Sequence, residues 1–151
     1  MSWSSKTASS FLRLEPEQQT RFSPRGHLVR AALEGIAYGI GQNFDQLREA
    51  GIPVSTVTAV GGGTKTPLWL QIVSDVCNVR QIVPEVTVGA SYGDAMLAGI
   101  GIGVLKPEDI KKIVKIKTVI EPDPERHAAY AKYRELYREL YERTKDIMHE
   151  L

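Results

Sequence analysis

Three consecutive glycines separate a strand-like segment from a predicted helix, and they are the residues of this chain best suited to chemistry. Residues 57–60 are rich in β-branched side chains, Gly61, Gly62 and Gly63 follow, and Pro67 fits the first turn of a helix. Because glycine has no Cβ, an anion can approach the main-chain amides closely, and the N-terminus of the following helix adds unpaired donors. The loop therefore predicts a binding site for a nucleotide phosphate.

Two other phosphate-binding patterns do not fit this segment. A Walker A loop requires Gly-Lys-Ser/Thr in succession, whereas Thr64 separates Gly63 from Lys65. A dinucleotide fold requires a third glycine where Thr66 stands, and no acidic residue ends the next strand near Val83. A tight turn without a ligand remains an alternative, because glycine is a common turn residue. Lys65 points either to phosphates or to water.

Composition and charge limit the partners of the chain. Its 151 residues include 19 Lys and Arg and 18 Asp and Glu, and the net charge of +1 gives no bulk attraction to nucleic acid or an anionic membrane. No apolar run approaches the roughly 18 residues of a membrane span. Residues 1–6 lack the apolar core of a secretion signal, so we expect a cytoplasmic protein. We expect the single Cys77 to pack rather than to react.

The predicted elements follow the order helix, strand, helix, strand, helix, helix, strand, helix, which is typical of the α/β class. Apolar spacing, caps and β-branched runs place them. The expected helices are 27–49, a segment that opens at Pro67 after Thr64 or Thr66 as its cap, 91–101, a segment that opens at 106–109, and a segment that opens at Pro124; the expected strands are 54–60, 79–83 and 115–120.

Four of the six tyrosines lie in the segment that opens at Pro124, where they recur at helical spacing. They are Tyr130, Tyr133, Tyr137 and Tyr141. An amphipathic helix that docks on the body through its tyrosines is the favoured interpretation, and an aromatic platform for a base or a sugar is the alternative.

Three blocks of sequence resemble one known family. They are residues 27–38 (HLVRAALEGIAY), 61–76 (GGGTKTPLWLQIVSDV) and 89–95 (GASYGDA). In this order and at these separations they resemble the C-terminal domain of FGGY-type carbohydrate kinases, with xylulokinase-like members as the nearest. The resemblance covers residues 25–151 and leaves residues 1–24 as an unmatched leader, either disordered or unrelated.

The resemblance implies a fold and a nucleotide. The fold is part of an actin-like, ribonuclease H-like ATPase domain, with helices packed on a small mixed sheet. Such kinases transfer a phosphoryl group from ATP to a hydroxyl of a sugar or polyol, with Mg²⁺ carried by the nucleotide and no protein ligand assigned to it here. The nucleotide contacts of the family map onto Gly61, Gly62, Gly63, Thr64 and Thr66.

No catalytic residue or metal ligand is assigned, because the resemblance places the catalytic aspartate in an N-terminal domain that has no counterpart in these 151 residues. Glu34, Asp75 and Asp94 lie within helical patterns, and we expect them to be structural. The chain is therefore expected to be a kinase fragment that is inactive alone, made by truncation, choice of the expressed region or a broken reading frame. The alternative is a non-catalytic interaction or oligomerisation module, which self-associates through surface that the missing strands would expose.

Overall fold

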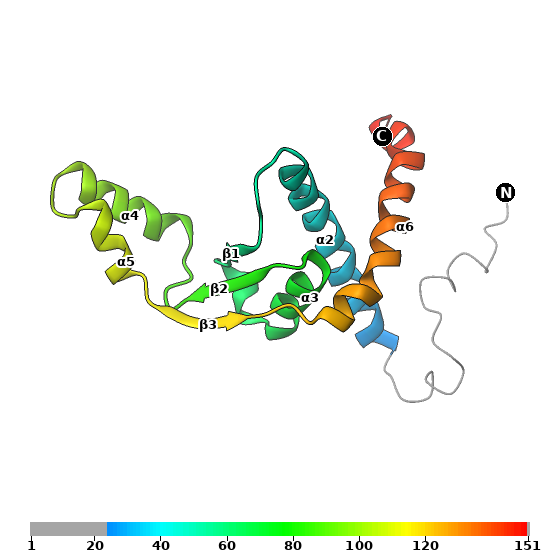
Figure 1. Cartoon of the computed structure of the whole chain (residues 1–151), viewed down its shortest axis with the longest axis horizontal. Coiled ribbons are helices and arrows are strands. Elements are labelled where there is room, and N and C mark those ends of the chain that lie inside the picture. The colour runs from blue at the N-terminus through cyan, green and yellow to red at the C-terminus, as the bar shows by residue number, and fades with distance from the viewer. Residues whose placement is uncertain (1–23, 151) are drawn as a thin grey trace. The chain divides into compact units, whose positions relative to one another are not determined.

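The computed structural model describes residues 24–150, and their helices and strands follow the expected order (Figure 1). The elements are α2 (Pro24–Glu49), β1 (Thr56–Thr58), the 3₁₀ turn η1 (Gly62–Lys65), α3 (Pro67–Cys77), β2 (Arg80–Pro84), α4 (Ala90–Gly101), the 3₁₀ turn η2 (Pro107–Asp109), α5 (Ile110–Ile113), β3 (Ile116–Ile120) and α6 (Pro124–His149). The described residues divide into two units between Ala32 and Leu33, and the description below concerns the unit that begins at Leu33. The expected leader, residues 1–24, lies almost entirely outside the described residues.

The described strands form one mixed sheet in the order β1, β2, β3. β1 and β2 run parallel, with Thr56 opposite Arg80, and α3 connects them as the crossover helix that a parallel pair requires. β3 returns antiparallel to β2, with Gln81 opposite Ile120 and an irregularity at Val83/Pro84. The α/β class and the small mixed sheet are thus confirmed.

Local signals place several element boundaries as the sequence predicts. α2 ends where Gly51 adopts a left-handed φ of 81°, which glycine tolerates without strain. α3 starts with Pro67 at its first position and ends at Asn78, which takes the left-handed conformation. The carboxylate of Asp123 caps α6 by accepting bonds from the N–H groups of Glu125 and Arg126, which lowers the pKa of Asp123.

β1 is much shorter than the sequence pattern suggests, whereas β2 and β3 differ from the expected strands by one residue at their ends. β1 covers three residues, Thr56–Thr58, of the expected 54–60, because only these pair with β2. Pro84 was expected to lie just after the strand, but it is the last residue of β2. Proline has no N–H to donate, yet it still pairs with Ile116 of the antiparallel strand β3. Gly62 and Gly63 are the first two residues of the 3₁₀ turn η1, so this turn separates β1 from α3. The segment 106–109 opens η2 first and α5 only at Ile110.

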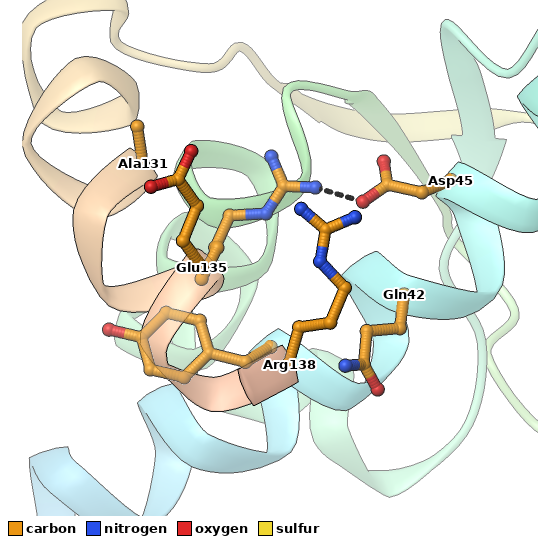
Figure 2. A pocket seen from close by; sticks show the side chains of 7 residues that line it. Gln42, Asp45, Ala131, Glu135 and Arg138 are labelled. Atoms are coloured by element: carbon orange, nitrogen blue, oxygen red, sulfur yellow. Dashed lines mark hydrogen bonds and ion pairs between the residues drawn. The ribbon is translucent and has the colours of Figure 1, made fainter. Parts of the chain in front are cut away.

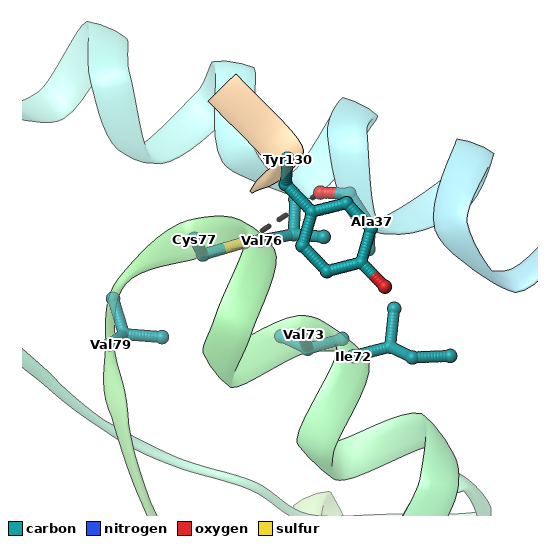
Figure 3. Close-up of a cluster of buried hydrophobic side chains, with 7 residues drawn as sticks. All are labelled: Ala37, Ile72, Val73, Val76, Cys77, Val79 and Tyr130. Carbon is teal, nitrogen blue, oxygen red and sulfur yellow. Dashed lines mark hydrogen bonds between the residues drawn. The ribbon is translucent and has the colours of Figure 1, made fainter. Parts of the chain in front are cut away.

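The hydrophobic core lies where α2, α3 and α6 meet (Figure 3). Its buried members are Ala37, Ile72, Val73, Val76, Cys77, Val79 and Tyr130. Cys77 packs here as expected, and its thiol donates to the carbonyl of Ala37 at 3.6 Å. Tyr38 meets the rings of Tyr130 and Tyr137 at centroid distances of 6.1 and 5.7 Å, so these two tyrosines of α6 pack against α2.

Polar groups tie the sheet and α6 to α3. The buried side chain of Gln81 on β2 donates to the carbonyl of Leu70 and to the hydroxyl of Ser74. Asp75, also buried, accepts from the main-chain N–H of Asp123 at 2.8 Å. These bonds satisfy buried polar atoms and fix the position of α3 between the sheet and the C-terminal helix.

Among residues 24–150, no helix has the length and apolar character that crossing a bilayer requires.

Candidate functional site

The glycine loop turns sharply at its first residue. Gly61 has φ 87° and ψ −170°, a conformation that is open almost only to glycine. Its N–H donates to the carbonyl of Thr87 at 2.7 Å. The segment that leads into α4 therefore anchors the start of the loop.

A 3₁₀ turn closes the other half of the loop. The N–H of Thr64 donates to the carbonyl of Gly61 at 3.2 Å, and the N–H of Thr66 donates to that of Gly63 at 3.1 Å. The hydroxyl of Thr64 also donates to the Gly61 carbonyl, at 2.7 Å. Thr64 therefore stabilises the turn itself and does not cap α3. Thr66 occupies the N-cap position, but its side chain makes no capping bond, so the cap expected from either threonine is not formed.

Two main-chain amides remain open at the centre of the loop. Gly62 and Gly63 are both exposed, and no described residue accepts a hydrogen bond from either N–H group. A Cβ built on Gly62 would meet no atom within 4 Å. An anion can therefore reach these donors, and α3 begins four residues after Gly63 with its positive dipole end. A phosphate fits this arrangement chemically.

The residues expected to bind nucleotide share this single loop. Gly61 and Thr64 shape it, Gly62 and Gly63 present the open amides, and Thr66 lies exposed where α3 begins. Lys65 is also exposed, and its direction toward a ligand remains a prediction.

The three candidate acids occupy different settings. Asp75 is buried and accepts bonds from Arg126 Nε at 2.7 Å and from Gln71 Nε2 at 2.8 Å. Glu34 accepts a bond from the hydroxyl of Tyr130 at 2.8 Å. Asp94 is exposed on α4. The first two therefore hold helices together, as expected. Within residues 24–150, no group of three His, Cys, Asp or Glu side chains is arranged to hold a metal ion.

Burial makes Cys77 a poor nucleophile. Desolvation raises the pKa of its thiol to about 11, and the nearby Arg134 and Arg48 offset this only in part. At neutral pH the group stays a thiol that donates to a carbonyl.

A small cavity that the sequence did not reveal lies between α2 and α6 (Figure 2). Its volume is about 170 Å³, and it is lined by Tyr38, Gln42, Asp45, Ala131, Arg134, Glu135 and Arg138. Arg134 forms an ion pair with Asp45, which also binds Arg48. Helical spacing predicts which residues share a face of α2 or of α6. The packing of the two helices is what brings together residues some 90 positions apart, such as Asp45 and Arg134. With two acidic and two basic groups, the lining is charge-balanced and selects no ligand.

Comparison with known proteins decides the family. The model of the C-terminal domain of the FGGY family of carbohydrate kinases matches residues 3–102. The chain belongs to the FGGY family. The match begins within the segment that sequence inspection left unassigned, so the domain boundary near residue 25 stays a prediction.

Individual FGGY kinases agree with this assignment. A xylulose kinase from Staphylococcus epidermidis is 33% identical over 129 residues, which cover 84% of this chain and 26% of that kinase. The solved xylulose kinase from Rhodospirillum rubrum shares 28% identity with a TM-score of 0.69 over 85% of this chain and 27% of its own. Plasmodium falciparum glycerol kinase, solved with ADP, shares 28% identity with a TM-score of 0.64 over 80% of this chain and 24% of its own.

These similarities confirm the expected fold, part of an actin-like, ribonuclease H-like ATPase domain of the FGGY type. They also confirm that the resemblance is to the C-terminal domain and to xylulokinase-like members. The chain spans about a quarter of the length of the FGGY kinases that it matches.

Proposed function

We propose that this chain forms the nucleotide-binding part of an ATP-dependent carbohydrate kinase, with the amides of Gly62 and Gly63 as donors to phosphate. The observation that carries the proposal is that these two exposed, unpaired amides lie in the 3₁₀ turn that precedes α3 in a chain of the FGGY family. The relative from Plasmodium falciparum was solved with ADP, which supports a nucleotide as the ligand.

Each loop residue has a separate role in this proposal. Gly61 makes the turn, and the hydroxyl of Thr64 holds the Gly61 carbonyl. Gly62 and Gly63 bind phosphate oxygens, assisted by the dipole of α3. Thr66, exposed at the start of α3, borders the adenine, as the family resemblance implies.

The phosphoryl transfer requires groups beyond this loop. Mg²⁺ carried with ATP would neutralise charge on the phosphate oxygens. The proposed acceptor is a hydroxyl of a sugar or polyol, and the carboxylate that receives its proton would lie in the part of FGGY kinases that this chain does not span. We therefore propose that the chain alone binds nucleotide and does not transfer phosphate.

Calorimetric titration of the purified chain with ADP in the presence of MgCl₂ tests the binding site. Gly62→Val should abolish saturable binding, because its side chain would occupy the space above the open amides. The matched control is Gly101→Val, at an exposed glycine with equally open surroundings and an ordinary φ. If the unaltered chain does not bind ADP, or if Gly62→Val binds it as tightly, the nucleotide site is refuted.

An activity assay measures turnover. ADP release from ATP should stay at the level of a no-protein control when xylulose or glycerol is added to the chain alone. ADP release that depends on xylulose or glycerol and lies well above that level would show that the chain is a complete kinase. It would contradict the proposed inactivity, but the proposed nucleotide site would still stand.

Self-association is a second candidate role, favoured by one observation. Leu97, Ile102 and Val104 in and beyond α4 are 66%, 78% and 73% exposed, and apolar surface of this kind is covered on self-association. If the chain is an oligomerisation module, light scattering should give a dimer or larger species that Leu97→Lys converts to a monomer. A monomeric wild-type chain would remove this candidate.

A further inference from the structure

The three glycines of the loop have different structural surroundings. Gly61 adopts a positive φ, whereas Gly62 and Gly63 do not. Gly62 has open space around it, so nothing in the described chain prevents a side chain there. A Cβ on Gly63 would lie 2.9 Å from Nε1 and 3.0 Å from Cδ1 of Trp69. Any side chain at position 63 would therefore require the indole or the loop to shift.

Trp69 reaches the loop because of its place in α3. It is the third residue of the helix, and side chains in helices lean toward the N-terminus, here over the preceding turn. Its ring is half-buried and packs against the hydrophobic core. One side of the indole is thus held by the core while one edge lies against Gly63.

Hydrogen bonds hold the loop at Gly61 and at the carbonyl of Gly63, but they do not engage the two central amides. Gly61 is bonded to Thr87, and Thr64 and Thr66 are bonded within the turn, whereas no described residue bonds the amides of Gly62 and Gly63. Glycine loses more conformational freedom on ordering than any other residue. Apart from the chain neighbours of each glycine, the described side chain that comes within 4 Å of a Cβ position at Gly62 or Gly63 is that of Trp69.

We propose that Trp69 is a positioning residue of the nucleotide site, whose indole holds the Gly62–Gly63 segment in the conformation that presents both amides to phosphate. This inference rests on the proposed function. Trp69 lowers the entropy lost on binding by ordering the loop in advance, as preorganisation does in other sites. Fixing the backbone of about one residue corresponds to roughly a tenfold change in affinity.

Two substitutions of Trp69 separate positioning from general stability. Trp69→Ala removes the ring and should raise the Kd for ADP, with MgCl₂ present, about tenfold. Trp69→Phe keeps an aromatic ring in place and should restore the Kd to within about threefold of the wild-type value. The matched control is Val73→Ala, a buried core residue of the same helix, which should destabilise the chain while leaving the Kd unchanged.

Hydrogen exchange without nucleotide gives an independent measure of loop order. The bonded amides of Gly61, Thr64 and Thr66 should exchange about tenfold faster in Trp69→Ala than in the wild-type chain, and Val73→Ala should not reproduce this. Gly63→Ala should speed the same amides in the wild-type background and add little in Trp69→Ala, because the clash is then gone. Additive effects would show that the indole does not constrain residue 63.

The outcomes distinguish this inference from the proposed function. If the wild-type chain binds ADP and Trp69→Ala binds it equally well, or if Val73→Ala loses as much affinity, Trp69 does not position the site although the site stands. If the wild-type chain does not bind ADP, the nucleotide proposal fails, and with it the ligand part of this inference. The exchange data still decide in that case whether Trp69 orders the loop, and unchanged exchange in Trp69→Ala overturns that as well.

Discussion

The carboxylate of Asp75 on α3 accepts a hydrogen bond from Nε of Arg126 on α6 at 2.7 Å. The Asp75 side chain is only 3% exposed, whereas that of Arg126 is 50% exposed. The buried carboxylate is therefore paired with a guanidinium group that is half exposed to water. The other oxygen of Asp75 accepts from Gln71 and from the main chain at Asp123. Every bond of this carboxylate therefore joins α3 to itself or to the start of α6.

Asp75→Asn should lower the free energy of unfolding by about 2–4 kcal/mol, because an amide NH₂ would face donors that the carboxylate now satisfies. Urea denaturation measures the change. Glu139→Gln, which breaks the exposed pair between Glu139 and Arg143, is the matched control and should cost at most about 0.5 kcal/mol. Equal losses in the two variants would refute a structural role specific to Asp75.

Tyr130→Phe should destabilise the chain by about 1–2 kcal/mol, because the buried ring keeps its packing but loses the bond to Glu34. Tyr133 lies one turn further along α6 and is half exposed. Tyr133→Phe should therefore change stability by no more than about 0.5 kcal/mol. Thermal unfolding of both variants checks the prediction, and similar behaviour of the two would contradict the assignment of Tyr130 to the core.

Gly61→Ala and Gly62→Ala should differ although the residues are adjacent. Gly61 has φ 87°, so alanine there should cost about 1–3 kcal/mol. Gly62 has an ordinary φ and open surroundings, so alanine should change stability by less than about 0.5 kcal/mol or raise it slightly. Denaturant titration without nucleotide measures both, and a large loss at Gly62 would mean that the loop is more tightly packed than described.

Cys77 should make the chain less stable at high pH. Burial raises the pKa of its thiol from 9.0 to about 11 in the folded chain. Between these values the unfolded chain releases the proton and the folded chain retains it, so the unfolded state is favoured increasingly as pH rises from about 9. The contribution is fully present below pH 9, and about 2–3 kcal/mol should be lost by pH 11.

Comparison with Cys77→Ala isolates this effect, because both chains share all other titrating groups. The difference in free energy of unfolding between the two should be constant below pH 9 and change in favour of Cys77→Ala above it. A difference that stays constant to pH 11 would mean that the thiol titrates normally.

The sequence determined the elements whose signals are local. Pro67 at the start of α3, Gly51 after α2 and the helical spacing of the tyrosines after Pro124 each depend on residues within one or two turns, so their meaning survives without the rest of the chain. The sequence also predicted the glycine triplet between a strand and a helix, and the family resemblance, because both rest on short blocks of sequence. Strand lengths were not, because β1 extends only as far as β2 offers partners.

The tertiary structure alone decided what each loop residue does. The close approach of the Trp69 indole to Gly63 depends on the packing of that ring against the core. The anchoring of Gly61 requires a carbonyl 26 positions further along the chain, at Thr87. Thr64 could have capped α3, but its hydroxyl reaches the Gly61 carbonyl instead because the 3₁₀ turn brings the two together. The contacts of Gly61 with Thr87 and of Gly63 with Trp69 depend on how separate elements pack, and no periodicity or composition encodes them locally.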